Sequence, residues 1–302
     1  MKVTLDGINA LVKKDAERFV EECEKNYFCQ VKAVSEEIAT HNGRTLVMLA
    51  GPSGSGKTTT ASMLKKDFQK MGRNAITVSL DDFYSENNLK YTFEDGTVDF
   101  ETVKALDVDL IGECLSKLLE DGKCNLPHFN FKTKKRDKFI ETEIEKDGII
   151  IVEGLHAINP VITDKLESER MRKIYISVSS RIYDGEKVLL TKRDMRFIRR
   201  LIRDYHHRNT EVEYTFYLWN GVRKGEDRYL FPFSNRSDIR IDSIHPYEIC
   251  VFKDTALELL SHISENSIYY DEANSLKERI SAFEALPESI IPEKSLLNEF
   301  IE

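Results

Sequence analysis

Apolar residues form short continuous runs that alternate along the chain with stretches of helical spacing. The runs lie at 45–50, 75–80, 148–153, 173–178 and 237–242. Helical spacing is found between and after them, at 57–71, 103–119, 192–208 and 251–263. Buried strands that alternate with helices are typical of a parallel sheet covered on both faces. The pattern therefore predicts an α/β fold.

The two ends of the chain lie outside this alternation. Residues 5–40 carry apolar positions at helical spacing and predict one or two amphipathic helices, which end at a turn signal. The charged tail is expected to be helical near 273–285. We therefore divide the chain into a helical N-terminal extension (1–44), an α/β domain (45–263) and a tail (264–302). The extension is either a packing element or a contact in a homo-oligomer.

A glycine-rich loop follows the first apolar run. Residues 51–58 fit G-x-x-x-x-G-K-[ST] at every fixed position. Glycines allow backbone N–H groups to converge on a phosphate, and the helix that follows adds its positive N-terminal end. Lys57 is expected to reach the β- and γ-phosphates, and the Thr58 hydroxyl to bind Mg²⁺. We therefore predict ATP and Mg²⁺ as ligands of Gly51, Ser53, Gly54, Ser55, Gly56, Lys57, Thr58 and Thr59.

Acidic residues follow two of the other apolar runs. Asp81 comes directly after 75–80, and Glu153 ends 148–153. Ligands of an open parallel sheet bind beyond the carboxyl ends of its strands, so both acids are expected beside the glycine-rich loop. A carboxylate at this position can bind Mg²⁺ or take the proton of a hydroxyl. We predict that Asp81 and Glu153 both bind Mg²⁺ and that Asp81 also takes the proton. The chain lacks an Asn-Lys-x-Asp motif, which disfavours a GTPase.

The predicted helix at 192–208 is strongly basic. Arg196, Arg199, Arg200 and Arg203 recur at spacings of three and four, so they share one face. Such a face is consistent with simple solvation or with nucleic-acid binding, but the net charge of −8 disfavours a nucleic-acid partner. We favour a segment, 192–209, that closes over the phosphates, with Arg199 and Arg203 as catalytic cations.

Several motifs in this order resemble the uridine kinase and phosphoribulokinase family. They lie at 51–58, 79–84, 98–100, 126–131, 151–154 and 199–204. The resemblance covers about 45–250 and implies a P-loop kinase fold with a five-stranded parallel sheet. It also implies roles for individual residues: Asp81 as catalytic base, Glu153 as a metal partner, Asp99 on the ribose hydroxyls, Phe129 on the nucleobase, Tyr84 beside the substrate, and Arg196 with its neighbours in the lid.

One position departs from the uridine kinases. Lys134 stands where they carry a histidine that reads the base, within a basic run at 132–138. That run fits a solvated β-hairpin, but Lys134 and Arg136 also favour an acceptor that carries a phosphate or a carboxylate. We predict an ATP-dependent kinase that acts on the 5′-OH of uridine or cytidine. The alternatives are a kinase for a sugar phosphate or a pantothenate-like acceptor, and an ATP-dependent switch without a small acceptor.

The overall composition agrees with an ordinary soluble enzyme. The chain has 302 residues, of which 41% are hydrophobic and 32% charged. The cysteines show no metal-like spacing, and neither a signal peptide nor a membrane-spanning apolar stretch is present. We therefore expect a cytoplasmic protein whose partner is a small, nucleoside-like molecule, with no nucleic-acid or membrane partner.

Overall fold

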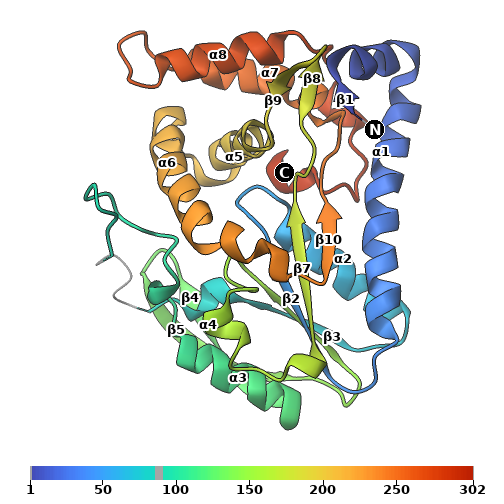
Figure 1. Ribbon diagram of the computed structural model, residues 1–302, viewed down its shortest axis with the longest axis vertical. Coiled ribbons are helices and arrows are strands. Elements are labelled where there is room, and N and C mark those ends of the chain that lie inside the picture. The colour runs from blue at the N-terminus through green and yellow to red at the C-terminus, as the bar shows by residue number, and fades with distance from the viewer. Residues whose placement is uncertain (1, 86–90, 302) are drawn as a thin grey trace.

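A five-stranded, all-parallel sheet lies at the centre of the computed structural model, which describes residues 2–85 and 91–301. Its strands run in the order β10–β7–β2–β6–β3 (Figure 1). They are β2 (Thr45–Ala50), β3 (Ala75–Ser79), β6 (Ile149–Glu153), β7 (Met171–Ser177) and β10 (Ile239–Asp242). Each strand overlaps one of the apolar runs. The predicted α/β fold with a five-stranded parallel sheet is confirmed.

Helices cover both faces of this sheet. Alternate residues of a strand point to opposite faces, so Val47 and Leu49 of β2 join one buried cluster and Leu46 and Met48 join another. The first cluster includes residues of α1 (Leu5–Ala39), α2 (Lys57–Lys70), α5 (Lys192–Arg208), α6 (Val212–Tyr229) and α7 (Glu248–Ser261). The second includes residues of α3 (Val108–Glu120) and the short α4 (Pro160–Thr163).

The N-terminal extension is the long helix α1, which runs along one side of the molecule (Figure 1). Asp15 has non-helical backbone angles, so α1 consists of two helical segments joined at a kink. Its buried face contacts α2, and the Tyr27 hydroxyl lies 2.6 Å from Thr60 Oγ1. The extension therefore packs directly behind the helix that follows the glycine-rich loop.

The C-terminal tail contains α8 (Tyr270–Ser281) and the short α9 (Asn298–Ile301). The helix expected near 273–285 is thus present and begins slightly earlier. Leu296, Leu297 and Phe300 are fully buried in the same apolar cluster as α1. The two ends of the chain therefore share one hydrophobic core with the sheet.

Two smaller sheets complete the fold. The strands β4 (Lys123–Asn130) and β5 (Lys135–Glu143) form an antiparallel hairpin, and Lys134 in its turn has a positive φ of 56°. This is the hairpin that the basic run suggested. A three-stranded sheet joins β1 (Val3–Thr4), β8 (Ile182–Asp184) and β9 (Lys187–Leu190).

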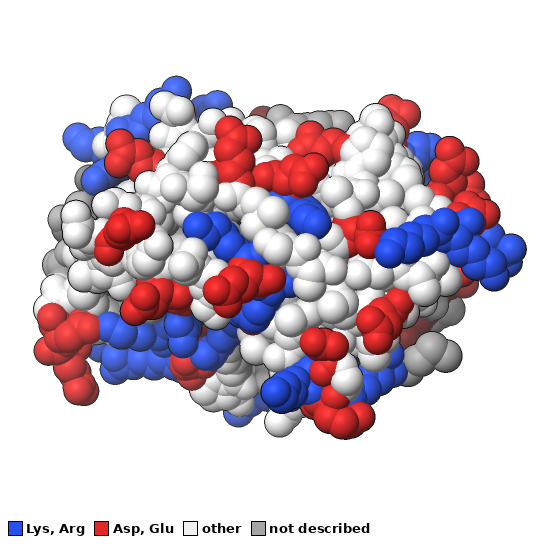
Figure 2. All heavy atoms as spheres, turned by 90° about the horizontal axis from the view of Figure 1, so that it is seen from above, with Lys and Arg blue, Asp and Glu red and all other residues white. Residues whose placement is uncertain are grey.

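Acidic and basic side chains are interspersed on the face seen in Figure 2. This mixture agrees with a chain that carries many charges of both signs and a net charge of −8. Among the described residues, no helix is both long and apolar enough to span a membrane.

Candidate active site

The glycine-rich loop connects β2 to α2, which is the strand–loop–helix context that its motif requires. Gly54 and Gly56 have φ values of 72° and 84°, in the left-handed region that glycine adopts without strain. A Cβ on Gly51 would come within 2.3 Å of the Ile176 carbonyl oxygen. The fixed glycines are therefore required by the backbone of the loop and by its close contact with β7.

A cavity of about 460 Å³ opens beside this loop. Its wall brings together residues from distant parts of the chain. Those predicted from the sequence are Ser53, Gly54, Ser55, Gly56, Lys57, Thr58, Asp81, Tyr84, Phe129, Lys134, Glu153 and Arg203. Glu101, Phe131, Arg200, Arg208 and Glu299 also line it and were not singled out as site residues.

The two predicted acids lie at neighbouring strand ends. Ser79 and Glu153 are paired across β3 and β6, and the Ser79 hydroxyl donates a 2.7 Å hydrogen bond to Glu153 Oε1. Asp81 follows two residues after Ser79 and lines the same cavity. Burial among protein atoms raises the pKa of both Asp81 and Glu153, and the nearby charge of Lys57 opposes that rise. The two carboxyls are thus electrostatically coupled to the lysine of the loop.

The oxygen atoms on this side of the cavity fit a magnesium ion. Thr58, Asp81 and Glu153 offer a hydroxyl and two carboxylates, which are the hard ligands that Mg²⁺ prefers. The described residues include no cluster of three or more His, Cys, Asp or Glu side chains that would form a complete metal site. Magnesium usually keeps waters and phosphate oxygens as further ligands, so Thr58, Asp81 and Glu153 would need to supply only part of its shell.

Aromatic rings form another part of the wall. The centroid of the Phe129 ring lies 5.7 Å from that of Tyr84 and 5.1 Å from that of Phe131. Lys134, in the hairpin turn, also faces the cavity. Arg136 does not, because it donates 2.8 Å to Asp107 Oδ2 and 3.2 Å to the Tyr84 carbonyl. Of the two basic residues proposed for the acceptor, the structure places only Lys134 at the cavity.

The acid expected to hold acceptor hydroxyls lies elsewhere. Asp99 is buried, accepts a 2.6 Å hydrogen bond from the Tyr229 hydroxyl and a 3.2 Å bond from the Glu101 backbone N–H, and does not line the main cavity. Glu101 lines it instead, and burial beside Glu226 raises its pKa to about 7. The sequence carried only a weak signal for Glu101, because it lies directly after the motif at 98–100 that contains Asp99.

The arginines of α5, the helix that we predicted to form a lid, divide into two groups. Arg196 and Arg199 are buried in ion pairs with Glu226 and Glu248, at 2.7 and 2.6 Å. Neither lines the cavity, so the geometry does not support Arg199 as a catalytic cation or Arg196 as a substrate contact. Arg200, Arg203 and Arg208 do line it. Sequence spacing placed Arg196, Arg199, Arg200 and Arg203 on one face, but it could not show that two of them have buried acidic partners.

One buried carboxylate gathers the three arginines of the cavity. Asp204 is 1% exposed and lies 3.0 Å from Arg200 Nε, 3.0 Å from Arg203 Nη2 and 3.3 Å from Arg208 Nη1. A shared carboxylate fixes the positions of guanidinium groups that would otherwise repel one another. The cavity therefore has a cationic side whose three guanidinium groups are held in place by one carboxylate.

The sequence model of the "Phosphoribulokinase / Uridine kinase family" matches residues 46–249. This match spans the sheet, the glycine-rich loop, Asp81, Glu153 and α5. The chain belongs to this family. It is also 31% identical over 200 residues to the uridine kinase of Borrelia duttonii, with 65% of this chain and 85% of that protein covered.

A second curated relative, the uridine kinase of Ureaplasma parvum, is 26% identical over 198 residues, covering 65% of this chain and 86% of its own length. A solved structure described as a possible uridine kinase from Bacillus stearothermophilus has a TM-score of 0.47 and 16% identity. It covers 70% of this chain and 97% of its own. The family match and the curated relatives confirm the predicted resemblance to the phosphoribulokinase and uridine kinase family, and with it the assignment as a kinase.

Both ends of this phosphoribulokinase/uridine kinase family member lie outside the matched residues. The C-terminal end nevertheless reaches the loop: Thr59, predicted to bind the nucleotide, donates from its backbone N–H and its hydroxyl to Glu299 Oε2. Glu299 could not be found from the family motifs, because the matched region ends well before it.

Proposed function

We propose that this protein transfers the γ-phosphate of ATP, with Mg²⁺, to a hydroxyl group of a small molecule, and that the acceptor is the 5′-OH of a pyrimidine nucleoside. One observation carries the proposal. The phosphate loop, two strand-end carboxylates and an aromatic wall all face a single cavity of about 460 Å³. This proposal also places the enzyme in the cytoplasm, where ATP is available.

The donor side of the cavity consists of the loop and its neighbours. The loop N–H groups and Lys57 suit the phosphates, and Thr58 and Glu153 suit the ion that accompanies them. Magnesium, when bound, offsets negative charge on the phosphate oxygens. Arg200, Arg203 and Arg208 face the same space and can stabilise the charge that spreads over the transferred group.

Asp81 is our candidate base. In the transfer, the acceptor oxygen forms a bond to the γ-phosphorus, and the bond from that phosphorus to the bridging oxygen of ADP breaks. The hydroxyl proton passes to the Asp81 carboxylate. The raised pKa of Asp81 suits this role, because a base whose pKa lies closer to the working pH accepts a proton more readily.

The acceptor side favours a flat molecule that carries hydroxyls. Phe129, Tyr84 and Phe131 provide ring surfaces against which a pyrimidine can pack. Glu101 provides a carboxylate that can accept hydrogen bonds from sugar hydroxyls. It takes the role that we predicted for Asp99 from the sequence.

Lys134 supports a second candidate function. It lines the cavity near the aromatic wall, and a lysine can bind a phosphate or a carboxylate on the acceptor. A kinase for a sugar phosphate or for a pantothenate-like acid therefore remains the alternative for this site. The nucleoside is favoured because the rings of Tyr84, Phe129 and Phe131 lie close together in the cavity wall that also contains Lys134.

An acceptor panel tests the proposal. Formation of ADP with MgATP should depend on uridine or cytidine and should be at least about tenfold slower with ribose 5-phosphate, fructose 6-phosphate or pantothenate. Asp81→Asn should lower kcat by about 10²–10⁴-fold, since it removes the base. Asp82→Asn is the matched control, because its amide oxygen can still accept the hydrogen bond that Asp82 receives from the Phe129 N–H.

The outcomes separate the alternatives. Turnover with a phosphorylated sugar or an acid while both nucleosides are inert would replace the nucleoside with an anionic acceptor. An Asp81→Asn rate equal to that of the wild type would exclude Asp81 as the base. ATP binding without turnover of any acceptor by the wild-type protein would favour an ATP-dependent switch.

A further inference from the structure

The last residues of the chain lie inside the molecule. Figure 1 shows the C-terminal end beside α5 and close to the centre of the fold. Leu296, Leu297 and Phe300 are each fully buried. The Phe300 ring also lies under Arg199, with 5.3 Å between the guanidinium carbon and the ring centroid. The C-terminal segment 295–301 is therefore a fixed part of the core.

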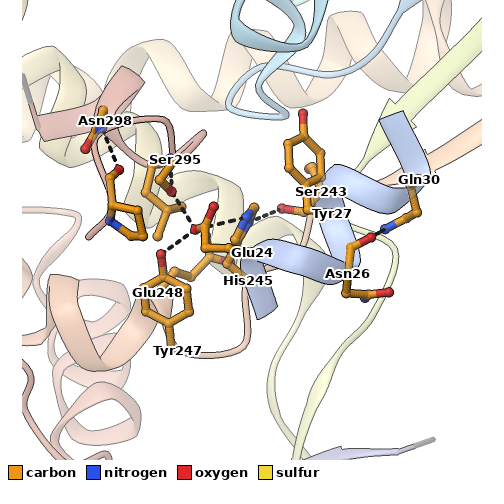
Figure 3. A network of polar contacts seen from close by, with 12 residues as sticks. Glu24, Asn26, Tyr27, Gln30, Ser243, His245, Tyr247, Glu248, Ser295 and Asn298 are labelled. Atoms are coloured by element: carbon orange, nitrogen blue, oxygen red, sulfur yellow. Dashed lines mark hydrogen bonds and ion pairs between the residues drawn. The ribbon is translucent and has the colours of Figure 1, made fainter. Parts of the chain in front are cut away.

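A buried carboxylate of the N-terminal extension holds this segment in place. Glu24 Oε1 accepts hydrogen bonds of 2.6 Å from both the Ser295 and the Tyr247 hydroxyls (Figure 3). His245 Nε2 lies 3.4 Å from the same oxygen. Because Glu24 belongs to α1, the N-terminal extension and the C-terminal segment are joined to each other and to the loop that follows β10.

The C-terminal segment meets the phosphate loop at two points. Glu299 Oε2 accepts a 2.5 Å hydrogen bond from the Thr59 hydroxyl and a 3.3 Å bond from the Thr59 backbone N–H. The Leu296 side chain covers Gly56 so closely that a Cβ there would come within 2.3 Å of Leu296 Cδ1. The segment thus lies against the start of α2.

The donors that Glu299 occupies belong to a phosphate-binding element. Thr59 is the third residue of α2, and the first N–H groups of a helix have no partner within the helix. In a loop of this motif, those groups and the positive end of the helix hold the α- and β-phosphates of a nucleotide. A carboxylate is itself an anion with hydrogen-bond acceptors, so Glu299 supplies the same kind of ligand from within the chain.

We propose that Glu299 competes with the phosphates of the nucleotide for Thr59 and thereby weakens nucleotide binding. This inference rests on the nucleotide site of the proposed function but not on the identity of the acceptor. Binding would require the Glu299 carboxylate to turn away from Thr59, because two anions cannot share these donors. The C-terminal segment would then set the nucleotide concentration at which the kinase operates.

The surrounding packing indicates that only the side chain of Glu299 has to move. Leu296, Leu297 and Phe300 would each expose apolar surface if the whole segment left the core. Glu299 is half-buried and faces the open cavity, so rotation of its side chain exposes little apolar surface. The competition is therefore expected to be rapid and local, without release of residues 295–301.

Calorimetric titration of the full-length protein with the magnesium complex of AMP-PNP, without an acceptor, tests this inference. Glu299→Ala should lower the Kd by about 5- to 50-fold, since a charge-assisted hydrogen bond no longer has to be broken. Glu299→Gln should change the Kd in the same direction by a smaller factor. Glu293→Gln is the matched control, because Glu293 is an exposed carboxylate of the same tail and should leave the Kd unchanged.

Two results would overturn the inference. A Glu299→Ala Kd equal to that of the wild type would show that the carboxylate does not compete. A Kd that rises would show that Glu299 completes the nucleotide site rather than opposing binding. Thermal unfolding of each variant shows whether the segment is still folded. Failure of the nucleoside proposal would appear only in the acceptor panel, whereas failure of this inference appears in the titration without an acceptor.

Discussion

Arg199 Nε lies 2.6 Å from Glu248 Oε2, and both side chains are fully buried. Arg199 also donates 3.1 Å to the Gly54 carbonyl and 2.6 Å to the Ser243 carbonyl. This single guanidinium therefore joins α5, the glycine-rich loop and the segment after β10. An arginine with this set of partners supports the loop from behind and does not face the cavity.

Replacing Arg199 should mainly reduce stability. Arg199→Ala leaves Glu248 buried without its partner, so we expect the free energy of unfolding to fall by about 3–5 kcal/mol. Urea unfolding followed by circular dichroism measures this change. Arg193→Ala is the control. Arg193 lies on α5, as Arg199 does, and loss of its exposed pair with Asp227 of α6 should cost no more than about 1 kcal/mol. Equal losses for the two variants would contradict the structural role of Arg199.

Asp204 is expected to act on catalysis by positioning Arg200, Arg203 and Arg208. Asp204→Asn removes the charge that these guanidiniums share, so we expect kcat to fall by about 10- to 100-fold with a smaller change in the KM for ATP. Steady-state kinetics measure both constants. Asp194→Asn is a suitable control, because Asp194 caps the same helix and pairs with Arg279 away from the cavity.

Loss of stability alone would give a different result. An Asp204→Asn protein that unfolds at a lower temperature but keeps the kcat of the wild type would show that the carboxylate only stabilises the helix. Partial recovery of kcat in Asp204→Glu would support the positioning role, because the longer side chain keeps the charge.

The sheet and the phosphate loop could be predicted because their signals are local. Continuous apolar runs mark buried parallel strands, and the glycine spacing at 51–58 is required by the backbone itself. Asp81 and Glu153 could be placed beside the loop because the carboxyl ends of parallel strands meet at one edge. These predictions needed no knowledge of contacts between distant segments.

The rest of the site depends on such distant contacts. Arg199 and Arg200 are adjacent in the sequence, yet one pairs with Glu248 and the other faces the cavity. Which arginine is buried depends on where the acid of α7 lies, and spacing within α5 does not contain that information. Glu299 reaches the loop from about 240 residues away, a contact that only the folded chain reveals.

Glu101 should make binding of the acceptor depend on pH. Burial near Glu226 and Asp81 raises its pKa to about 7, although Arg200 and Lys57 lower it in part. Below that pH Glu101 is mostly protonated, and above it the carboxylate can accept hydrogen bonds from two hydroxyls. The KM for the acceptor should therefore fall by about 3- to 10-fold as the pH rises from about 6 to about 8, because hydrogen bonds to a charged acceptor are stronger.

Glu101→Gln provides the test of this pH dependence. The variant has no titrating group at this position, so its KM for the acceptor should be high and nearly constant across the same pH range. The KM for ATP, measured in parallel, should follow the same curve in both proteins, because we propose that Glu101 binds the acceptor and not the nucleotide. If the acceptor KM of Glu101→Gln still depends on pH, another group causes the dependence. Asp81 would then be the first candidate, because burial also raises its pKa.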